Sequence, residues 1–243
     1  MTYCLAIKVR DGMVFASDSR TNAGLDDYRS HSKMFTYSVG DRCIVILTSG
    51  NLSTSQSVFH MIENDLKSPK DGVNLNTCTD LEEMASYLGK LALENSTVSD
   101  EQIQGNVNFS SFFILGGQIK NQEQKIFLIY PEGNYIECSD NSPYFQIGET
   151  KYGKPILDRV IDTDTSLGDA ARAAIVSLDS TMRSDLTVGP PIDFVVYKKN
   201  QINLDVKDRF KFDSPYFVNI SEIWHEKLIA SFKDLPSFEW EEN

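Results

Sequence analysis

The sequence contains few cysteines and histidines, and they are scattered. Its four cysteines, Cys4, Cys43, Cys78 and Cys138, form no C-x-x-C pair and have no histidine at ligand spacing, which argues against a zinc site. The three histidines accompany no serine or cysteine signature such as G-x-S-x-G, so a Ser-His-Asp triad has little support. We therefore expect neither a metal nor an organic cofactor.

Positive charge and long apolar runs are also scarce. The chain has 23 lysines and arginines against 35 acidic residues, a net charge of -12, and no basic run, which argues against nucleic acid or an anionic membrane as its partner. No apolar stretch approaches the roughly 20 residues that span a bilayer, and the amino terminus lacks the regions of a signal peptide. We expect a cytoplasmic protein.

The composition that remains is that of an ordinary globular protein. The chain has 243 residues, of which 41% are hydrophobic and 24% charged. Such a chain can bury a sizeable core as one large domain or two small ones.

The first twenty residues predict a β-hairpin with bulky apolar residues at alternate positions. We expect a three-residue loop, residues 10–12, in which Gly12 has the left-handed conformation. This loop puts Val9 opposite Met13 and gathers the bulky residues on one face. The same register makes Thr2 and Asp18 diagonal neighbours, roughly 7 Å apart, on the other face. A hydroxyl group near the amino terminus then lies beside a carboxylate.

This placement of Thr2 has a chemical use. A threonine hydroxyl is a poor nucleophile until a base takes its proton, and a threonine at the true amino terminus carries its own base, the α-amine. The condition is removal of Met1, which we expect because the initiator methionine is normally trimmed before a small residue.

Periodicity predicts the remaining elements. The expected strands span 33–37, 43–49, 109–119, 124–130, 135–138, 144–147, 192–197 and 202–206, with those between 109 and 147 forming a second sheet. The expected helices span 52–66, 81–92, 156–161, 166–182 and 216–231, and the stretches 21–32, 68–79 and 95–108 are expected as loops.

Segments spread between residues 2 and 205 carry a family resemblance. They are Thr2 without a propeptide, D-S-R-T-N-A-G from Asp18, Lys33, L-T-S-G-N from Leu47, and two later segments, 146–158 and 182–193. Together they resemble proteasome β-type subunits, which are N-terminal nucleophile hydrolases, and more closely the bacterial proteasome-like Anbu family. The resemblance implies an α+β fold, a four-layer αββα sandwich, that self-assembles into a ring or a helical homo-oligomer.

The resemblance also assigns roles to residues whose pattern alone leaves two interpretations. On periodicity, Lys33 is a solubilising charge at a strand edge, Gly50 is either a turn glycine or an oxyanion-hole donor, and Asp185 is a loop acid at a helix end. By resemblance, Asp18 and Lys33 set the field around the amine of Thr2, and the Gly50 N–H holds the oxyanion. Asp185 then lies near the nucleophile.

Two positions depart from the proteasome pattern. Glu149 and Val188 stand where β-subunits carry serines of the hydrogen-bond network around the amine. An additional carboxylate would hold the amine in its protonated form, which weakens the base. Slow or conditional hydrolysis is the expected consequence.

The sequence therefore predicts a threonine-type peptidase or amidohydrolase domain over residues 1–209, with a helical extension over 210–243 that packs on the domain or on a neighbouring subunit. The alternative is a non-catalytic scaffold with the same fold. A weaker alternative is nucleotide binding, because Gly148 to Lys154 satisfies G-x-x-x-x-G-K. Pro155 counts against it, since it stands where Ser or Thr binds Mg²⁺.

Overall fold

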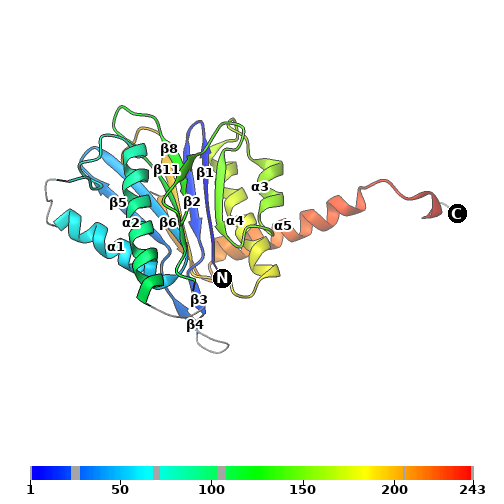
Figure 1. Ribbon diagram of the computed structural model, residues 1–243. Helices are drawn as coiled ribbons and strands as arrows, with labels where there is room; N and C mark the ends of the chain where they lie inside the picture. The colour runs from blue at the N-terminus through cyan, green and yellow to red at the C-terminus, as the bar shows by residue number, and fades with distance from the viewer. Residues whose placement is uncertain (1, 23–27, 68–71, 103–107, 205, 242–243) are drawn as a thin grey trace.

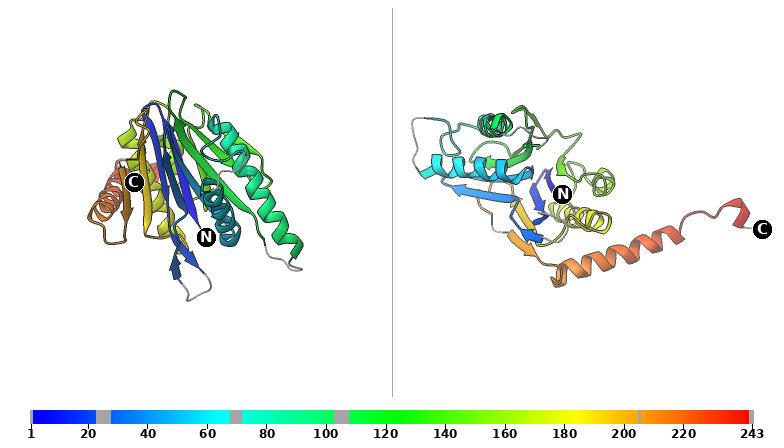
Figure 2. Two further views of the ribbon diagram at one scale, coloured as in Figure 1. Left: turned by 90° about the vertical axis from the view of Figure 1, so that its left-hand side faces the viewer. Right: turned by 60° about the horizontal axis from the view of Figure 1, so that its bottom comes forward.

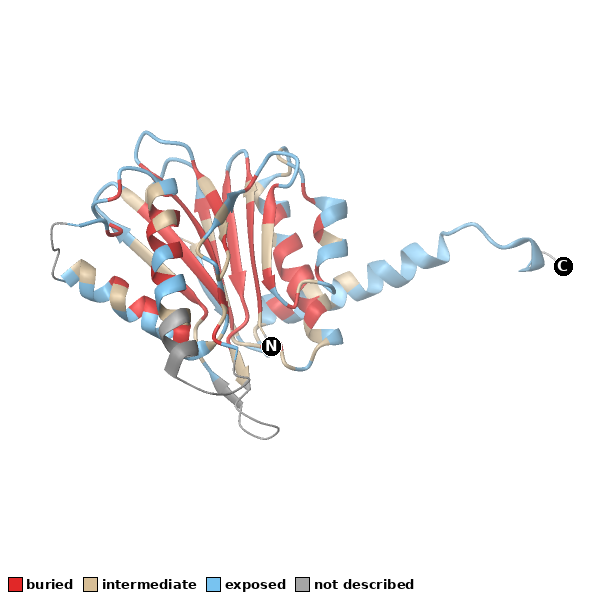
Figure 3. Cartoon of the chain, viewed as in Figure 1, coloured by how far each residue is buried: buried red, intermediate tan, exposed pale blue. Residues whose placement is uncertain are grey.

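Two antiparallel sheets lie face to face, with helices on both outer sides (Figure 1). The computed structural model describes residues 2–22, 28–67, 72–102, 108–204 and 206–241. Burial is concentrated in the sheets and on the helix faces that cover them (Figure 3). This arrangement confirms the predicted four-layer αββα sandwich.

The first sheet has the strand order β10-β1-β2-β11-β12. These strands are β10 (Tyr144–Gly148), β1 (Tyr3–Val9), β2 (Gly12–Ser17), β11 (Ile192–Lys198) and β12 (Val206–Phe210). Its outer face packs against α3 (Lys154–Val160) and α4 (Leu167–Ser184). The Ser166 side chain caps α4 by accepting a hydrogen bond from the amide of Asp169, as the spacing predicts.

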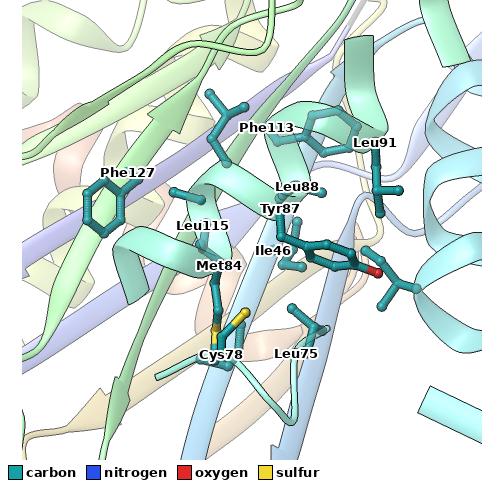
Figure 4. Packing of buried hydrophobic residues seen from close by; sticks show 14 of the residues in the cluster. Ile46, Leu75, Cys78, Met84, Tyr87, Leu88, Leu91, Phe113, Leu115 and Phe127 are labelled. Atoms are coloured by element: carbon teal, nitrogen blue, oxygen red, sulfur yellow. The ribbon is translucent and has the colours of Figure 1, made fainter. Parts of the chain in front are cut away.

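The second sheet has the strand order β5-β6-β7-β8-β9. These strands are β5 (Met34–Val39), β6 (Arg42–Gly50), β7 (Ser111–Ile119), β8 (Lys125–Ile129) and β9 (Tyr135–Glu137). Its outer face packs against α1 (Leu52–Lys67) and α2 (Leu81–Gln102). In this cluster Met84, Leu88 and Leu91 of α2 lie against Phe113 and Ile46 of the sheet (Figure 4).

Two segments lie outside these layers. A short pair, β3 (Arg20–Asn22) and β4 (Tyr28–Ser30), extends beyond the sheets at the end where the chain begins (Figure 1). Helix α5 (Pro215–Lys233) projects from the body and leads to a 3-10 turn, Glu239–Glu241 (Figure 2). None of the described helices is long and apolar enough to cross a membrane.

The register of the first hairpin differs from the prediction. β1 and β2 pair Cys4 with Ser17 and Val9 with Gly12, so the loop consists of residues 10 and 11 alone. Gly12 belongs to β2 and has φ of 158°, which is not the left-handed conformation of a three-residue loop. It is required for another reason, because a Cβ there would come within 2.1 Å of the Tyr197 carbonyl oxygen.

The error has a physical cause. The prediction assumed that the bulky residues of both strands share one face, but Leu5 and Ile7 belong to the cluster under the helices, whereas Met13 and Phe15 lie between the sheets. Both faces of this sheet are buried, so either face accommodates large side chains. Residue size therefore does not determine the register.

Four further expectations were wrong. The strand expected at 202–206 lies later in the chain, as β12 (Val206–Phe210). β10 pairs with β1 in the first sheet and does not belong with β7, β8 and β9. The stretch from residue 95 was predicted as a loop, but α2 continues through it to Gln102. Within the predicted loop 21–32, residues 21–22 belong to β3 and residues 28–30 to its paired strand β4. Residues 23–27, 68–71 and 103–107 of the predicted loops lie outside the described residues.

Candidate active site

Thr2 lies directly before β1, between two hollows at the end of the sandwich. One hollow has a volume of about 480 Å³ and the other about 440 Å³, and Thr2 and Gly50 line both. The carbonyl oxygen of Thr2 accepts a hydrogen bond of 2.7 Å from the amide of Glu149. The backbone of Thr2 is thus held by the segment that follows β10.

Asp18 is fully buried just after β2 and is held by three hydrogen bonds. Its Oδ1 accepts from the Tyr3 amide at 3.0 Å and from Lys33 Nζ at 2.7 Å, and its Oδ2 accepts from the Gly189 amide at 3.3 Å. Burial raises the pKa of the Asp18 carboxyl, whereas the Lys33 ammonium and the two amides oppose that rise. The carboxylate joins β1, the second sheet and the loop before β11.

Lys33 is not a solvated charge at a strand edge. Only 7% of the residue is exposed, and Nζ donates to Asp18 Oδ1 and, at 2.8 Å, to the Arg20 carbonyl oxygen. Lys33 also lines the larger hollow together with Thr2. The ammonium is therefore fixed in position, with Asp18 on one side and the hollow on the other.

Gly50 ends β6 with φ of 112°, and it lines both hollows together with Thr2. A Cβ there would lie 2.3 Å from the Ser110 carbonyl oxygen, so the position requires glycine. The next residue, Asn51, caps α1 by accepting hydrogen bonds from the amides of Ser53 and Thr54. Because the side chain of Asn51 occupies these helix amides, Gly50 is the candidate donor to an oxyanion.

Asp185 is not joined to this group directly. Its Oδ1 accepts hydrogen bonds from the amide and the hydroxyl of Thr187, and its Oδ2 is buried without a hydrogen-bond partner among the described residues. Asp185 does not line the hollows beside Thr2. The connection runs through Gly189, at the end of the same loop, whose amide reaches Asp18.

The two departures from the proteasome pattern have different surroundings. Val188 is buried in the apolar cluster under the helices of the first sheet. Glu149 is buried beside Thr2, with its amide bonded to the Thr2 carbonyl oxygen. The residue whose amide holds the Thr2 backbone therefore also carries a carboxylate.

Sequence reasoning missed several residues of the site. The larger hollow is also lined by hydroxyl-bearing residues, among them Thr21, Thr48 and Ser55. It is lined by Arg20 as well, which the predicted hairpin places opposite Thr2 but to which sequence reasoning gave no role. Thr48 Oγ1 and Ser55 Oγ lie 2.8 Å apart and link β6 to α1. Thr48 stands two residues before Gly50 in the family segment, but its hydroxyl gives no signal that distinguishes it from an ordinary strand residue.

The alternative chemistries find less support in the site. Among the described residues, no three His, Cys, Asp or Glu side chains gather as metal ligands. In the segment from Gly148 to Lys154, the amide of Glu149 is bonded to Thr2, and Lys154 Nζ donates to Tyr144 at 2.9 Å and to Asp158 at 3.0 Å. Two of the groups that would bind a phosphate in a P-loop, the Glu149 amide and the Lys154 ammonium, therefore already have partners.

Comparison with known proteins places this chain and its fold in a family. A family model described as "Proteasome subunit" matches residues 2–197. The chain therefore belongs to the proteasome subunit family, and its two sheets and outer helices have the fold of that class. A comparison with curated proteins finds no match.

Within this class the chain is similar to Anbu, the ancestral β-subunit. Anbu from Yersinia bercovieri is 39% identical, with a TM-score of 0.92 over 98% of this chain and 99% of that one. The helical assembly of the Anbu complex from Pseudomonas aeruginosa gives the same identity and TM-score over 99% and 100%. A Gly-1 mutant of Anbu from Hyphomicrobium sp. strain MC1 is also 39% identical, over 98% and 100%.

Proposed function

We propose that the chain is a threonine-type peptidase or amidohydrolase that uses Thr2 as its amino-terminal nucleophile once Met1 is removed. Thr2 Oγ1 attacks the carbonyl carbon of a peptide or amide, and the α-amine of Thr2 accepts the hydroxyl proton and passes it to the leaving nitrogen. The Gly50 N–H stabilises the oxyanion. Water then releases the acyl group from the threonine ester.

The observation that carries this proposal is the buried ion pair beside Thr2. Lys33 and Asp18 are 2.7 Å apart and largely shielded from water, at the hollow that Thr2 lines. Nearby positive charge favours the unprotonated, basic form of an amine. An ammonium held there by Asp18 therefore supports the role that the mechanism gives to the α-amine.

Asp185 and Glu149 complete the proposed electrostatics. Oδ1 of Asp185 accepts hydrogen bonds from the amide and hydroxyl of Thr187, in the loop whose Gly189 amide binds Asp18, and we assign Asp185 to positioning this loop. Glu149 has the opposite effect to Lys33, because a carboxylate near the amine favours its protonated form. We therefore propose a slow hydrolase at neutral pH.

The test is intact mass analysis before and after treatment with a peptide epoxyketone. We expect a parent chain that lacks Met1 and gains one inhibitor mass, and a Thr2→Ala variant that gains none. Thr36→Ala is the matched control, because Thr36 lies on β5 and does not line the hollows beside Thr2. Retention of Met1, or an adduct on the Thr2→Ala variant, would contradict the proposal.

We also propose that this cytoplasmic chain self-associates through its extension, residues 210–243. The Anbu of Pseudomonas aeruginosa forms a helical assembly. In this chain, Phe217 anchors the start of α5 in the body, whereas Phe232 near its end is 67% exposed. Exposed apolar residues along a projecting helix favour contact with a neighbouring subunit.

Phe232→Asp should give a smaller species in sedimentation velocity. Val39→Asp changes an exposed site on β5 and should leave the size of the species unchanged.

The alternative function is a non-catalytic scaffold with the same fold. The departures at Glu149 and Val188 favour it, because they alter the surroundings of the amine that the mechanism requires. The two functions are separated by the same mass experiment. A scaffold would assemble normally, and its Thr2 would stay unmodified.

A further inference from the structure

The smaller hollow beside Thr2 has apolar walls that come from both sheets. Phe112 of β7 and Leu128 of β8 belong to the second sheet, and Ile147 of β10 belongs to the first. The hollow has a volume of about 440 Å³, which lies within the range of small-molecule binding sites. Thr2 and Gly50 also line it.

Strand register explains why these side chains meet at the mouth of the sandwich. β7 and β8 pair Ile114 with Leu128, so Phe112, two residues from Ile114, lies on the same face of the sheet. Ile114 and Ile147 are members of the core between the two sheets, and Leu128 packs against that core. The apolar interior therefore continues to the rim of the hollow.

Phe112 is the residue at which this interior becomes accessible. It is 36% exposed, although its neighbours toward the middle of the sheet are buried. Its ring meets the Tyr130 ring edge-on at 6.1 Å, which holds it at the rim. A large apolar ring that is fixed and partly open to solvent is characteristic of a binding surface.

The larger hollow has a different chemistry. It is lined by the cationic side chains of Arg20 and Lys33 and by hydroxyl and amide groups, and it shares Thr2, Ser49 and Gly50 with the apolar one. A carbonyl group held at Thr2 and Gly50 therefore has one hollow on each side. The two parts of the substrate that flank the reacting bond meet different surroundings.

We infer that the apolar hollow binds a large apolar side chain of the substrate, aromatic or leucine-like, immediately beside the bond that Thr2 attacks. This inference rests on the proposed hydrolase function for its substrate but not for the binding site itself. Burial of the apolar group against Phe112, Leu128 and Ile147 supplies the driving force. Phe112 is then a specificity-determining residue.

The direct test uses saturation-transfer NMR to measure the binding of N-acetylphenylalaninamide to the full chain. We expect binding to the parent and to Thr2→Ala, and at least fivefold weaker binding to Phe112→Asp. Phe112→Leu should retain binding, which separates loss of the site from loss of the fold. Ile136→Asp is the matched control, because Ile136 of β9 is exposed and does not line the hollow.

Equal binding to Phe112→Asp and Ile136→Asp, or no binding to the parent, would overturn the inference. Cleavage of a random peptide library supplies the second readout. Phe, Tyr, Trp and Leu should be enriched at one position next to the cut bond, and Phe112→Asp should remove this enrichment. A library that stays uncut contradicts the hydrolase function, and the binding result then decides the site alone.

Discussion

At the scale of single residues, the Lys33–Asp18 pair combines structure with function. Asp18 is bonded to two backbone amides as well as to Lys33, so it joins three separate segments of the chain. Removing one member of a buried ion pair leaves the other without compensation, which typically costs about 3–5 kcal/mol. The pair is therefore expected to affect stability as well as the reactivity of Thr2.

Lys33→Met should lower the free energy of unfolding by about 3 kcal/mol and abolish the reaction of Thr2 with an epoxyketone. Urea denaturation measures the first effect and intact mass the second. The control is the double variant Asp18→Asn with Lys33→Met, which removes both charges. It should be more stable than Lys33→Met alone and equally unreactive. Equal stability of the two variants would contradict a buried charge as the cause.

Gly148 holds Thr2 through a close backbone approach. Its φ is 87°, and a Cβ there would lie 1.9 Å from the Thr2 carbonyl oxygen. Gly148→Ala should therefore displace Thr2, slow its modification at least tenfold and lower the unfolding free energy by more than about 2 kcal/mol. Denaturation and the rate of the mass shift measure both effects.

Gly40 provides the matched control for Gly148. It also has a positive φ, 62°, but no atom lies within 4 Å of an added Cβ. Gly40→Ala should thus show only the cost of the backbone conformation, about 1 kcal/mol, with normal modification of Thr2. Equal effects of the two variants would show that the contact with Thr2 does not matter.

At the scale of secondary-structure elements, local signals predicted helices better than strand pairing. The start of α4 was readable because Ser166 and Asp169 have the spacing of a cap. The strand that pairs with β10 could not be predicted, because the chain that follows β9 crosses to the other sheet and no local sequence pattern indicates this crossing. Strand pairing depends on contacts far apart in the sequence.

Ser166→Ala should lower the free energy of unfolding by about 1 kcal/mol, because the amide of Asp169 loses its 3.0 Å acceptor. Thermal or urea denaturation measures the change. Ser166→Thr retains a hydroxyl at the cap and should remain close to the parent. A Thr variant as unstable as the Ala variant would show that packing, and not the cap, is responsible.

At the scale of the whole molecule, burial affects all four thiols. Burial raises the pKa of Cys43 to about 11 and those of Cys78 and Cys138 to about 12, and it also raises the pKa of Cys4. In the unfolded chain, a cysteine thiol has the usual pKa of about 8.5. Above that pH the unfolded chain releases protons that the native chain retains, so stability falls as pH rises.

The free energy of unfolding should fall between pH 8 and pH 9.5 by about 1 kcal/mol for each buried thiol. Urea denaturation at several pH values measures this slope. Cys78→Ala removes one thiol and should give a shallower slope than the parent, whatever its absolute stability. If the slope of Cys78→Ala equals that of the parent, the Cys78 thiol has the same pKa in the native chain as in the unfolded chain, and the prediction is wrong.

Some properties of this protein follow from the sequence by itself. The helix starts and the choice of Thr2 as candidate nucleophile could be predicted, because periodicity, capping residues and the chemistry of an amino-terminal threonine are local features. The four-layer fold and the choice of Lys33 and Gly50 came from the family resemblance. The family resemblance supplied the assignment of roles.

Only the tertiary structure decided how these residues meet. The hairpin loop of residues 10 and 11, the place of β10 beside β1, and the apolar hollow bounded by Phe112 and Ile147 all depend on contacts between distant segments. In a sandwich, both faces of each sheet are buried, so the pattern of large and small residues along one strand is compatible with more than one register. The packing of the opposite layer selects among them.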